Sequence, residues 1–400
     1  MTETPKLETS TPETSASRMF DRKTILSIGA AIATIVTVGV GLSLSIPLLS
    51  FAMHSKGASG AMIGFNTSMS GFASILCAPF ISGWARRFGV RPLLAAAIAI
   101  GVLSLLAFRV TEPLWAWFPL RFLFGASLAV LFVISEYWIN AAAPEARRGL
   151  VLGVYASALS IGFALGPLLL TVAGTEGWRP FLTGSALFAL AALPVVLSGD
   201  SAPVITDKPS AGIASFLWAA PAGTLAAFVF GAAETGAMAL LPIYGTAIGL
   251  DRVGAVTLIS AFVLGNVLFQ IPIGLVADRV ERRWVLIFCA SVGALGMFII
   301  SVLPLGLTSL MLMLFGWGGI VAGLYTVGLA HLGSRFRGAD LAQANAAFVV
   351  MYSMGLIIGP PLAGFGMDVW PPRGFATTLA LLFAAYLAVI LARTAMRKSV

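Results

Sequence analysis

The sequence predicts an all-α polytopic membrane protein with twelve transmembrane helices arranged as two six-helix pseudo-repeats. Its 400 residues are 59% hydrophobic and 10% charged, with a mean hydropathy of +0.98, whereas soluble domains carry about 25% charged residues. The apolar runs have helix length and lack the strict alternation of barrel strands. We therefore expect α-helices to satisfy the backbone polar groups inside the bilayer.

Twelve apolar runs follow one another along the chain, and each is long enough to cross a hydrocarbon layer of about 30 Å. They lie near residues 25–51, 60–82, 92–110, 113–138, 149–173, 179–198, 213–245, 253–276, 284–304, 307–332, 342–367 and 374–393. The predicted parts are a disordered N-terminus (1–23), a first bundle (24–198), a polar loop (199–212), a second bundle (213–393) and a tail (394–400). The run after residue 24 is too long for the apolar region of a signal peptide.

The basic residues alternate between the two sides of the predicted membrane. Of the 24 Lys and Arg residues, 18 fall on the side of the N-terminus, 5 fall on the opposite side, and Arg121 lies inside a span. This asymmetry predicts a multi-pass protein of a bacterial-type inner membrane with both termini in the cytoplasm. The net charge of +8 then reflects topology, and we expect no nucleic-acid partner. Two distant cysteines give no metal-ligand spacing, so no metal and no cofactor are expected.

Arg121 is one of two charges that lie well within a predicted span. It lies roughly 6 to 8 residues inside the first boundary of the span 113–138, so about 9–12 Å deep, and Trp115 and Trp117 mark the aromatic belt at that end. A cation there costs at least about 2.5–3.5 kcal/mol unless it has a partner or reaches water. Arg121 is therefore a candidate functional residue, and the alternatives are an arginine that reaches the interface or a structural ion pair.

The two halves of the chain repeat the same landmarks. The loop Ser82–Leu94 matches Gly274–Leu286, with Arg86 aligned to Asp278 at an offset of 192 residues. The segment Gly162–Leu169 matches Gly355–Leu362 at an offset of 193 residues. Two landmarks at nearly one offset indicate parallel six-helix repeats, which is how one large class of transporters is built.

The basic loops carry the first resemblance to a known family. After the second span of the second half come Gly274, Asp278, Arg279, Arg282 and Arg283, and the first half has Arg87, Gly89 and Arg91 at the same place. This pattern resembles the loop signature of the major facilitator superfamily, a family of secondary transporters. Three positions depart from it, namely Ser82, Arg86 and Glu281. We expect Asp278 to pair with a basic group or cap a helix in one conformational state, although these charges alone also suit simple topology.

Spans four and five carry a second resemblance, to the drug:proton antiporters of this superfamily. The matching residues are Arg121 with Gly125, then Gly153, Gly162, Gly166 and Pro167, and the second half repeats Gly355, Gly359 and Pro360. Leu170 and Thr171 stand where the antiporter signature ends in a glycine pair. Small residues four apart permit close helix approach, either at a moving interface or in ordinary packing.

The resemblance implies that spans one, four, seven and ten line a central cavity. Arg121 would then face Glu234, which lies about 15 Å from the outer end of span seven. A carboxyl group in such a site can gain or lose a proton as its access to water changes. Glu234 is thus the candidate proton carrier, and a fixed ion pair with Arg121 is the alternative.

Other polar residues within the spans are candidates with weaker signals. Asn266 and Gln270 share a helix face and can contact substrate or a neighbouring helix. Tyr155 and Tyr325 are possible cavity residues, with packing as the alternative. Glu136 lies at the cytoplasmic end of span four near several arginines, which suits a structural or gating role.

The sequence and the resemblance together predict a secondary transporter that works by alternating access as a monomer in the lipid bilayer. We expect proton-coupled export of a small amphipathic or apolar solute, with a facilitator or proton symporter for a small polar metabolite as the alternative. The chain contains neither G-x-x-x-x-G-K-[ST] nor H-E-x-x-H. An enzyme and an ATP-driven pump are therefore not expected.

Overall fold

The structure is a computed structural model that describes residues 22–144, 148–197, 221–335 and 338–398. The described part contains twelve helices long and apolar enough to cross a membrane, which confirms the predicted fold class. The first six are α2 (Arg22–Ser55), α3 (Gly60–Phe88), α4 (Val90–Val110), α5 (Trp117–Ala142), α6 (Arg148–Ala173) and α7 (Arg179–Leu197). The last six are α9 (Pro221–Ala247), α10 (Arg252–Arg279), α11 (Arg282–Val302), α12 (Leu307–Gly333), α13 (Gly338–Val369) and α14 (Arg373–Lys398).

The helix ends differ from the predicted spans where polar residues continue a helix beyond the apolar run. Helix α2 begins at Arg22, inside the segment predicted to be disordered, and α14 continues to Lys398, so most of the predicted tail is helical. The predicted loop 199–212 and residues 1–21 lie outside the described residues. Helical turns cost little to extend past an apolar run, because each added residue gains a backbone hydrogen bond.

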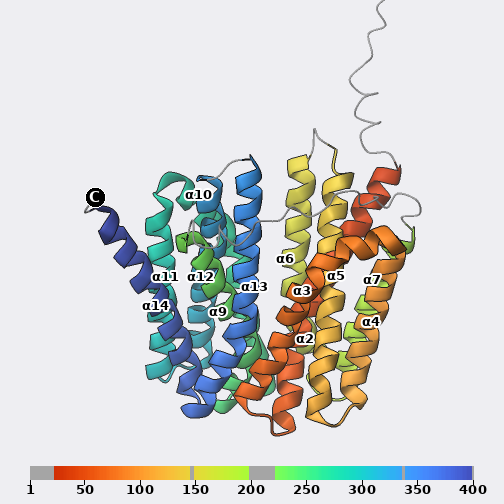
Figure 1. Cartoon of the computed structure of the whole chain (residues 1–400). Helices are drawn as coiled ribbons and strands as arrows, with labels where there is room; N and C mark the ends of the chain where they lie inside the picture. Colours follow the sequence, from red (N-terminus) through yellow and green to blue (C-terminus); the bar gives the residue numbers. More distant parts are fainter. Residues whose placement is uncertain (1–21, 145–147, 198–220, 336–337, 399–400) are drawn as a thin grey trace, which may run out of the picture.

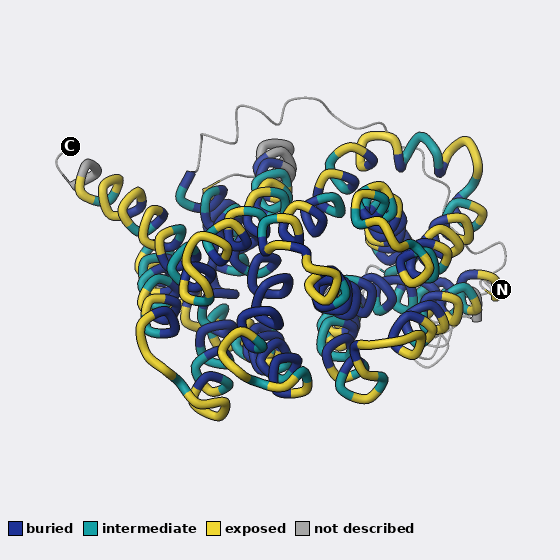
Figure 2. The backbone as a smooth tube through the Cα atoms, turned by 90° about the horizontal axis from the view of Figure 1, so that it is seen from below, coloured by how far each residue is buried: buried dark blue, intermediate teal, exposed yellow. Residues whose placement is uncertain are grey.

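The twelve helices form two bundles side by side, one from α2–α7 and the other from α9–α14 (Figure 1). Between the bundles, α3 packs against α13 and α6 packs against α10, and α9 contacts both α2 and α3. The second span of one half thus meets the fifth span of the other. Seen along the helices, buried residues gather within the bundles and where they meet, and exposed residues face outward (Figure 2).

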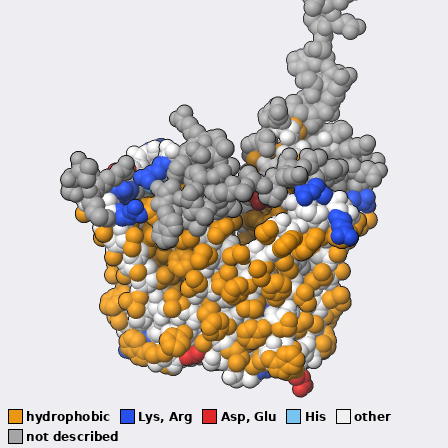
Figure 3. Space-filling model, viewed as in Figure 1, with side chains coloured by type: hydrophobic (Ala, Val, Ile, Leu, Met, Phe, Trp, Pro, Cys, Tyr) orange, Lys and Arg blue, Asp and Glu red, His pale blue; other side chains and the backbone are white. Residues whose placement is uncertain are grey.

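The molecule has two opposite faces. We call the one where α2 begins and α14 ends the terminal face, and the other the far face (Figure 1). Basic side chains are visible along the terminal face, whereas hydrophobic side chains cover the flank between the two faces (Figure 3). This distribution is the one expected of a protein whose flank contacts lipid.

The close contacts between α3 of the first bundle and α13 of the second lie near the far face. A Cβ atom at Gly64 of α3 would collide with the backbone of Pro360 in α13, and the glycines Gly60 and Gly364 meet in the same way. The Ser68 hydroxyl donates a hydrogen bond to the Ile357 carbonyl oxygen at 2.5 Å. These residues lie toward the far-face ends of α3 and α13, where the absence of side chains lets the two backbones touch.

Candidate functional site

Glu234 lies at the midpoint of α9, 13 residues from either end. From Val229 to Gly245 all residues of this helix except Glu234 are buried, and Glu234 is partly accessible. Helix α9 is enclosed by helices of both bundles. The carboxyl group therefore borders a space inside the protein and does not face lipid.

Two neutral side chains hold the Glu234 carboxyl group. The Tyr352 hydroxyl of α13 donates to Oε2 at 2.7 Å, and the Asn266 amide of α10 donates to Oε1 at 3.3 Å. The Gln270 amide continues the network by donating to Asn266 Oδ1 at 3.0 Å. Asn266 and Gln270 thus join Glu234 as predicted candidates that lie in one network. Tyr352 was missed, because a tyrosine within an apolar span has no sequence feature that separates a site from packing.

Aromatic rings surround this network. The ring of Phe230 lies 5.8 Å from that of Tyr325 and 6.2 Å from that of Tyr352, measured between centroids. Tyr325 and Tyr352 are 5.5 Å apart, and Phe348 lies 5.1 Å from Tyr325. We call Phe230, Tyr325, Phe348 and Tyr352 the aromatic wall. Its contacts fall within the ring separations at which aromatic pairs attract one another.

A second carboxyl group within the helices, that of Glu136, lies on α5 of the first bundle and is exposed. Next to Glu136, the Ser135 hydroxyl is 2.9 Å from the Tyr155 hydroxyl. In the part of the chain that the structure describes, the Glu136 carboxyl group has no hydrogen bond and no ion pair. Arg147, one of several arginines near that end of the span, lies outside that part.

Arg121 is not paired with Glu234 in this structure. It is 1% exposed and lies between α5 and α2 of the first bundle, where Nη1 donates to the Ser45 carbonyl oxygen at 3.4 Å. Its Nε atom and the Ser45 hydroxyl have no hydrogen-bond partner among the described residues. The expectation that the two buried charges meet is therefore not met in this state, because each is held by its own bundle.

The glycines of the predicted motifs have different surroundings. A Cβ atom at Gly162 would lie 2.5 Å from the Val36 carbonyl oxygen, and Gly166 meets Ser43, so both pack α6 against α2. Gly355 and Gly359 likewise pack α13 against α9, and Gly125 packs α5 against Ser70 of α3. Each of these close approaches lies within one bundle. By contrast, Gly153 and Gly274 have open space around them, and Pro167 lies inside α6.

The basic loops lie on the terminal face. Gly89 has a φ of +86° and joins α3 to α4, and Arg91 donates to the Val196 carbonyl oxygen at 3.1 Å. Asp278 is exposed and makes no hydrogen bond or ion pair with the described residues. It borders a cavity of about 330 Å³. That cavity is also lined by Ala277, Val280, Glu281, Arg282, Arg283, His331 and Ser334. The Arg87 and Arg279 side chains are exposed.

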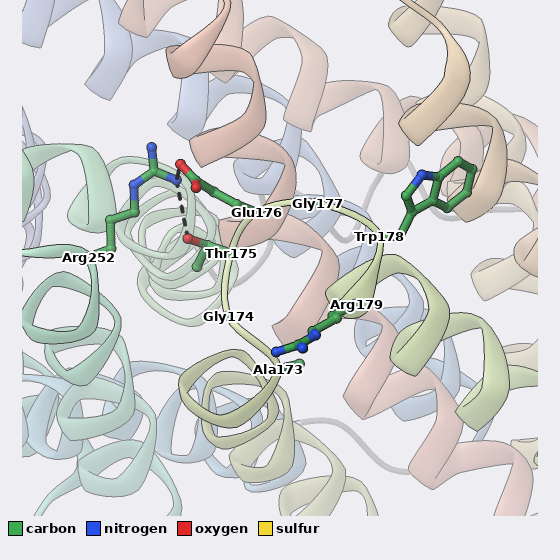
Figure 4. A pocket seen from close by; sticks show the side chains of 8 residues that line it. All are labelled: Ala173, Gly174, Thr175, Glu176, Gly177, Trp178, Arg179 and Arg252. Atoms are coloured by element: carbon green, nitrogen blue, oxygen red, sulfur yellow. Dashed lines mark hydrogen bonds and ion pairs between the residues drawn. The ribbon is translucent and has the colours of Figure 1, made fainter.

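The far face is closed by polar contacts that sequence reasoning missed. Asp368 of α13 accepts hydrogen bonds from the backbone N–H groups of Gly60 and Ala61, at 2.7 Å and 2.8 Å. Near the crossing of α6 and α10, Arg252 at the start of α10 forms an ion pair with Glu176 at 2.5 Å. The pair lies beside a cavity of about 570 Å³ (Figure 4). Both contacts join one bundle to the other. These charged residues did not stand out in the sequence, because charged side chains near helix ends and in loops usually contact water.

The sequence of this two-bundle chain matches a family model. The model described as Major Facilitator Superfamily matches residues 30–259 and 223–399. The chain belongs to the major facilitator superfamily. It is a transporter and not an enzyme, and it is a multi-pass protein of the inner membrane.

Relatives and solved structures agree with this family. The MFS-type transporter YfkF of Bacillus subtilis is 25% identical over 365 residues, which cover 89% of this chain and 92% of that protein. The nucleoside transporter NupG has a TM-score of 0.74 and 18% identity, over 94% of this chain and 100% of that chain. Another similar structure is that of a bacterial homolog to the human lysosomal transporter Spinster, in an inward-facing and unoccupied conformation. It has a TM-score of 0.77 and 12% identity, over 93% of this chain and 96% of that chain. These structural likenesses concern the fold alone.

Proposed function

We propose that this superfamily member exports a small amphipathic or apolar solute by alternating access, in exchange for protons bound at Glu234. The observation that carries the proposal is the accessible carboxyl group at the midpoint of an otherwise buried helix. A carboxyl group placed there has no structural ion pair with the described residues to explain it. Such a group within a membrane protein is a functional candidate by default.

The surroundings of Glu234 suit a group that changes its charge during transport. On the helices packed against α9, namely α2, α3, α10, α12, α13 and α14, the charged residues lie within about two turns of a helix end. No fixed cation in the middle of those helices therefore holds the carboxylate in its charged form. The free energy of ionising Glu234 then depends on how much water reaches it, which differs between two open states.

The contacts between the bundles support the alternating-access part of the proposal. Asp368 and the Arg252–Glu176 pair join the bundles at the far face, whereas Asp278 on the terminal face has no partner among the described residues. With both termini in the cytoplasm, as the basic residues predict, this is a state closed to the outside. Transport would break the far-face contacts and form others at Asp278.

The test is transport by purified protein in proteoliposomes with an imposed pH gradient. Glu234→Gln keeps the shape and the accepting oxygen but cannot release a proton, so we expect solute exchange to continue while its response to the gradient disappears. Glu112→Gln, which changes an exposed loop residue, serves as the matched control and should respond like the unchanged protein. A full response to the gradient in Glu234→Gln would exclude Glu234 as the coupling group.

The alternative is a facilitator or proton symporter for a small polar metabolite. The amides of Asn266 and Gln270 favour it, because an exposed Gln270 offers a donor and an acceptor beside the carboxyl group. Counterflow measured over a panel of polar and apolar solutes separates the two functions. Counterflow confined to polar metabolites, and lost in Gln270→Leu, would support the alternative.

A further inference from the structure

Arg121 carries a positive charge that the first bundle encloses. Its side chain is 1% exposed, and among the described residues its one hydrogen bond is the long contact of 3.4 Å from Nη1 to the Ser45 carbonyl oxygen. No carboxylate among the described residues forms an ion pair with it. A guanidinium group has five N–H donors, so most of them remain open here. An enclosed cation without a partner is costly, and a group of opposite charge would stabilise this part of the fold.

The hydroxyl group of Ser45 is a second unsatisfied donor at the same place. Elsewhere in α2, the hydroxyls of Thr34, Ser43 and Ser50 donate to the backbone carbonyl oxygen four residues earlier, as hydroxyls within helices commonly do. The Ser45 hydroxyl is buried and makes no hydrogen bond with any described residue. It belongs to the residue whose carbonyl oxygen contacts Arg121, so both unsatisfied donors lie where α2 meets α5.

A third unsatisfied hydroxyl lies at the neighbouring helix contact. Ser70 of α3 packs against Gly125 of α5, where an added Cβ atom would lie 2.5 Å from the Ser70 Cα atom. Gly125 follows Arg121 by about one helical turn and therefore shares its face of α5. The Ser70 hydroxyl oxygen is buried and also lacks a hydrogen-bond partner among the described residues. Helices α2, α3 and α5 thus each contribute an unsatisfied donor to the part of the first bundle around Arg121 and Gly125.

The charges of the surrounding helices favour an anion at this place. Within the helices α2, α3 and α5, Glu136 is the one described carboxylate, and it follows Arg121 by 15 residues along α5. At a rise of about 1.5 Å per residue, that is a separation of about 22 Å along the helix. Glu234 belongs to the second bundle and is bonded there to its own partners. A cation would be repelled by the guanidinium, whereas an anion accepts hydrogen bonds from N–H and O–H groups alike.

The enclosure of the site limits the size of the anion and indicates where it enters. Because Arg121 is 1% exposed, a bulky organic anion does not fit beside it. Arg121 lies one turn after Trp117, the equally enclosed residue at the far-face end of α5. Outside Trp117 lies Lys56, whose Nζ is 5.9 Å from the centroid of the indole ring. A small anion that approaches from the far face thus meets one cation at the rim and a second one inside.

We infer that the first bundle binds a chloride ion between Arg121 and Ser45, as an enclosed counterion that joins α5 to α2. The inference goes beyond the proposed function, because neither the proton nor the transported solute requires this site. One monovalent ion neutralises one guanidinium and leaves no net charge in the bundle. The Arg121 Nε–H group and the Ser45 hydroxyl donate to the ion, and the Ser70 hydroxyl approaches it from α3.

The test compares thermal unfolding of the purified, full-length protein in chloride and in gluconate, at constant pH and ionic strength. Gluconate is also monovalent but is too large for the enclosed site. We expect chloride to raise the melting temperature saturably, by about 3 °C at a concentration 100 times the dissociation constant, since a ligand that binds only the folded state stabilises it. Bromide has nearly the same size as chloride and should act in the same way.

Three variants locate the effect. Arg121→Met should abolish the saturable increase, and Ser45→Ala should lower the apparent affinity for chloride several-fold while the guanidinium remains. Arg109→Met removes an exposed arginine near the far-face end of α4 and is the matched control, which should keep the full effect. Each variant is first shown to be monodisperse in detergent.

The inference is overturned if chloride and gluconate give the same melting temperature for the unchanged protein. It is also overturned if Arg121→Met and Arg109→Met respond equally to chloride, because the effect would then be a general effect of salt. Should Arg121→Met fail to fold, Ser45→Ala decides, and an unchanged affinity for chloride in that variant would reject the site.

The chloride site and the proposed proton coupling fail separately. Glu234→Gln should keep the full chloride effect, because its side chain lies in a network of the second bundle. A full response of this variant to a pH gradient would reject the coupling and leave the chloride site intact. A melting temperature of the unchanged protein that ignores chloride would reject the site and leave the coupling intact.

Discussion

Arg121 and Glu234 are the two charges that the sequence placed deepest, and the structure holds them in separate networks. Arg121 bonds to the Ser45 carbonyl oxygen, and Glu234 bonds to Tyr352 and Asn266. Groups that share no partner contribute to stability independently. If the two charges meet during transport, they do so in another conformational state.

We therefore predict that Arg121→Met and Glu234→Gln have additive effects on thermal stability. In the state described here the double variant should differ from the sum of the single variants by no more than about 0.5 kcal/mol. The measurement is thermal unfolding of the four proteins in detergent. A coupling of several kcal/mol would instead show a buried ion pair, because removing one partner leaves the other charge unpaired.

At this scale the charges within the spans and the amides Asn266 and Gln270 could be predicted, whereas the aromatic partners could not. A charge within an apolar run is conspicuous because it is costly. Tyr352 and Phe230 resemble the many aromatic residues that pack transmembrane helices, so only the folded structure shows that they meet at Glu234. The far-face residue Asp368 was missed for the opposite reason, since a carboxylate at a helix end usually contacts water.

The helices α3 and α13 form the tightest described crossing between the bundles. Their glycines Gly60, Gly64 and Gly364 let the backbones touch, and Asp368 binds the first N–H groups of α3. A carboxylate at a helix N-terminus is favoured both by hydrogen bonds and by the helix dipole. Closure of the far face thus depends on a cap that one bundle supplies to the other.

Asp368→Asn should weaken this closure, because an amide offers one accepting oxygen where the carboxylate offers two. We expect a loss of about 1–3 kcal/mol for the closed far face. The readout is the reactivity of a cysteine introduced at the buried Ser68, in a protein whose native Cys77 and Cys289 are replaced by serine. Reactivity from the far side should rise at least several-fold.

Asp251→Asn is the matched control for this change. Asp251 also caps a helix at the far face, but its Oδ1 accepts a hydrogen bond from the backbone N–H of Gly254 in α10, the helix that directly follows it. It should leave the reactivity at Ser68 unchanged. Equal increases in both variants would mean that general loosening, and not the cap between bundles, exposes the crossing.

The basic loop that begins at Asp278, at the end of α10, is expected to make its contacts in the state in which the terminal face is closed. Asp278 has no partner among the described residues, so Asp278→Asn should not change the melting temperature of the state closed at the far face. It should shift the equilibrium between the two open states by removing a contact made when the terminal face closes. Distances between spin labels on α3 and α10 measure that shift. An unchanged distance distribution and unchanged transport would leave the loop with a topological role only.

The positions of the twelve helices followed from apolar runs, whereas the pairing between halves did not. The predicted run near 342–367 became α13, from Gly338 to Val369. Its contact with α3 depends on surfaces some 300 residues apart, which local periodicity does not encode. The sequence left Gly162 and Gly166 of α6 open to a moving interface or to ordinary packing, and in this state they lie against α2 in the same bundle.

The whole molecule carries its basic residues unevenly, and this predicts how it sits in the membrane. Eighteen Lys and Arg residues fall on the predicted side of the termini and five fall on the other. We predict that a cysteine at the exposed Ser55 of the far face reacts with an impermeant thiol reagent from outside the cell. One at the exposed Ser334 of the terminal face should react only after the membrane is opened, and the reverse pattern would contradict the topology.

The central claim is that Glu234 exchanges a proton for a solute, and proton release on binding tests it most directly. Purified protein in weakly buffered detergent is mixed with a solute that it exchanges in proteoliposomes, while a pH indicator records the protons released. We predict that the unchanged protein, at a pH where Glu234 is protonated, releases up to roughly one proton per bound solute molecule, since one carboxyl group holds one proton. Glu234→Gln should release none. Equal proton release by both proteins, or solute binding by the unchanged protein without proton release at every pH tested, would contradict the account.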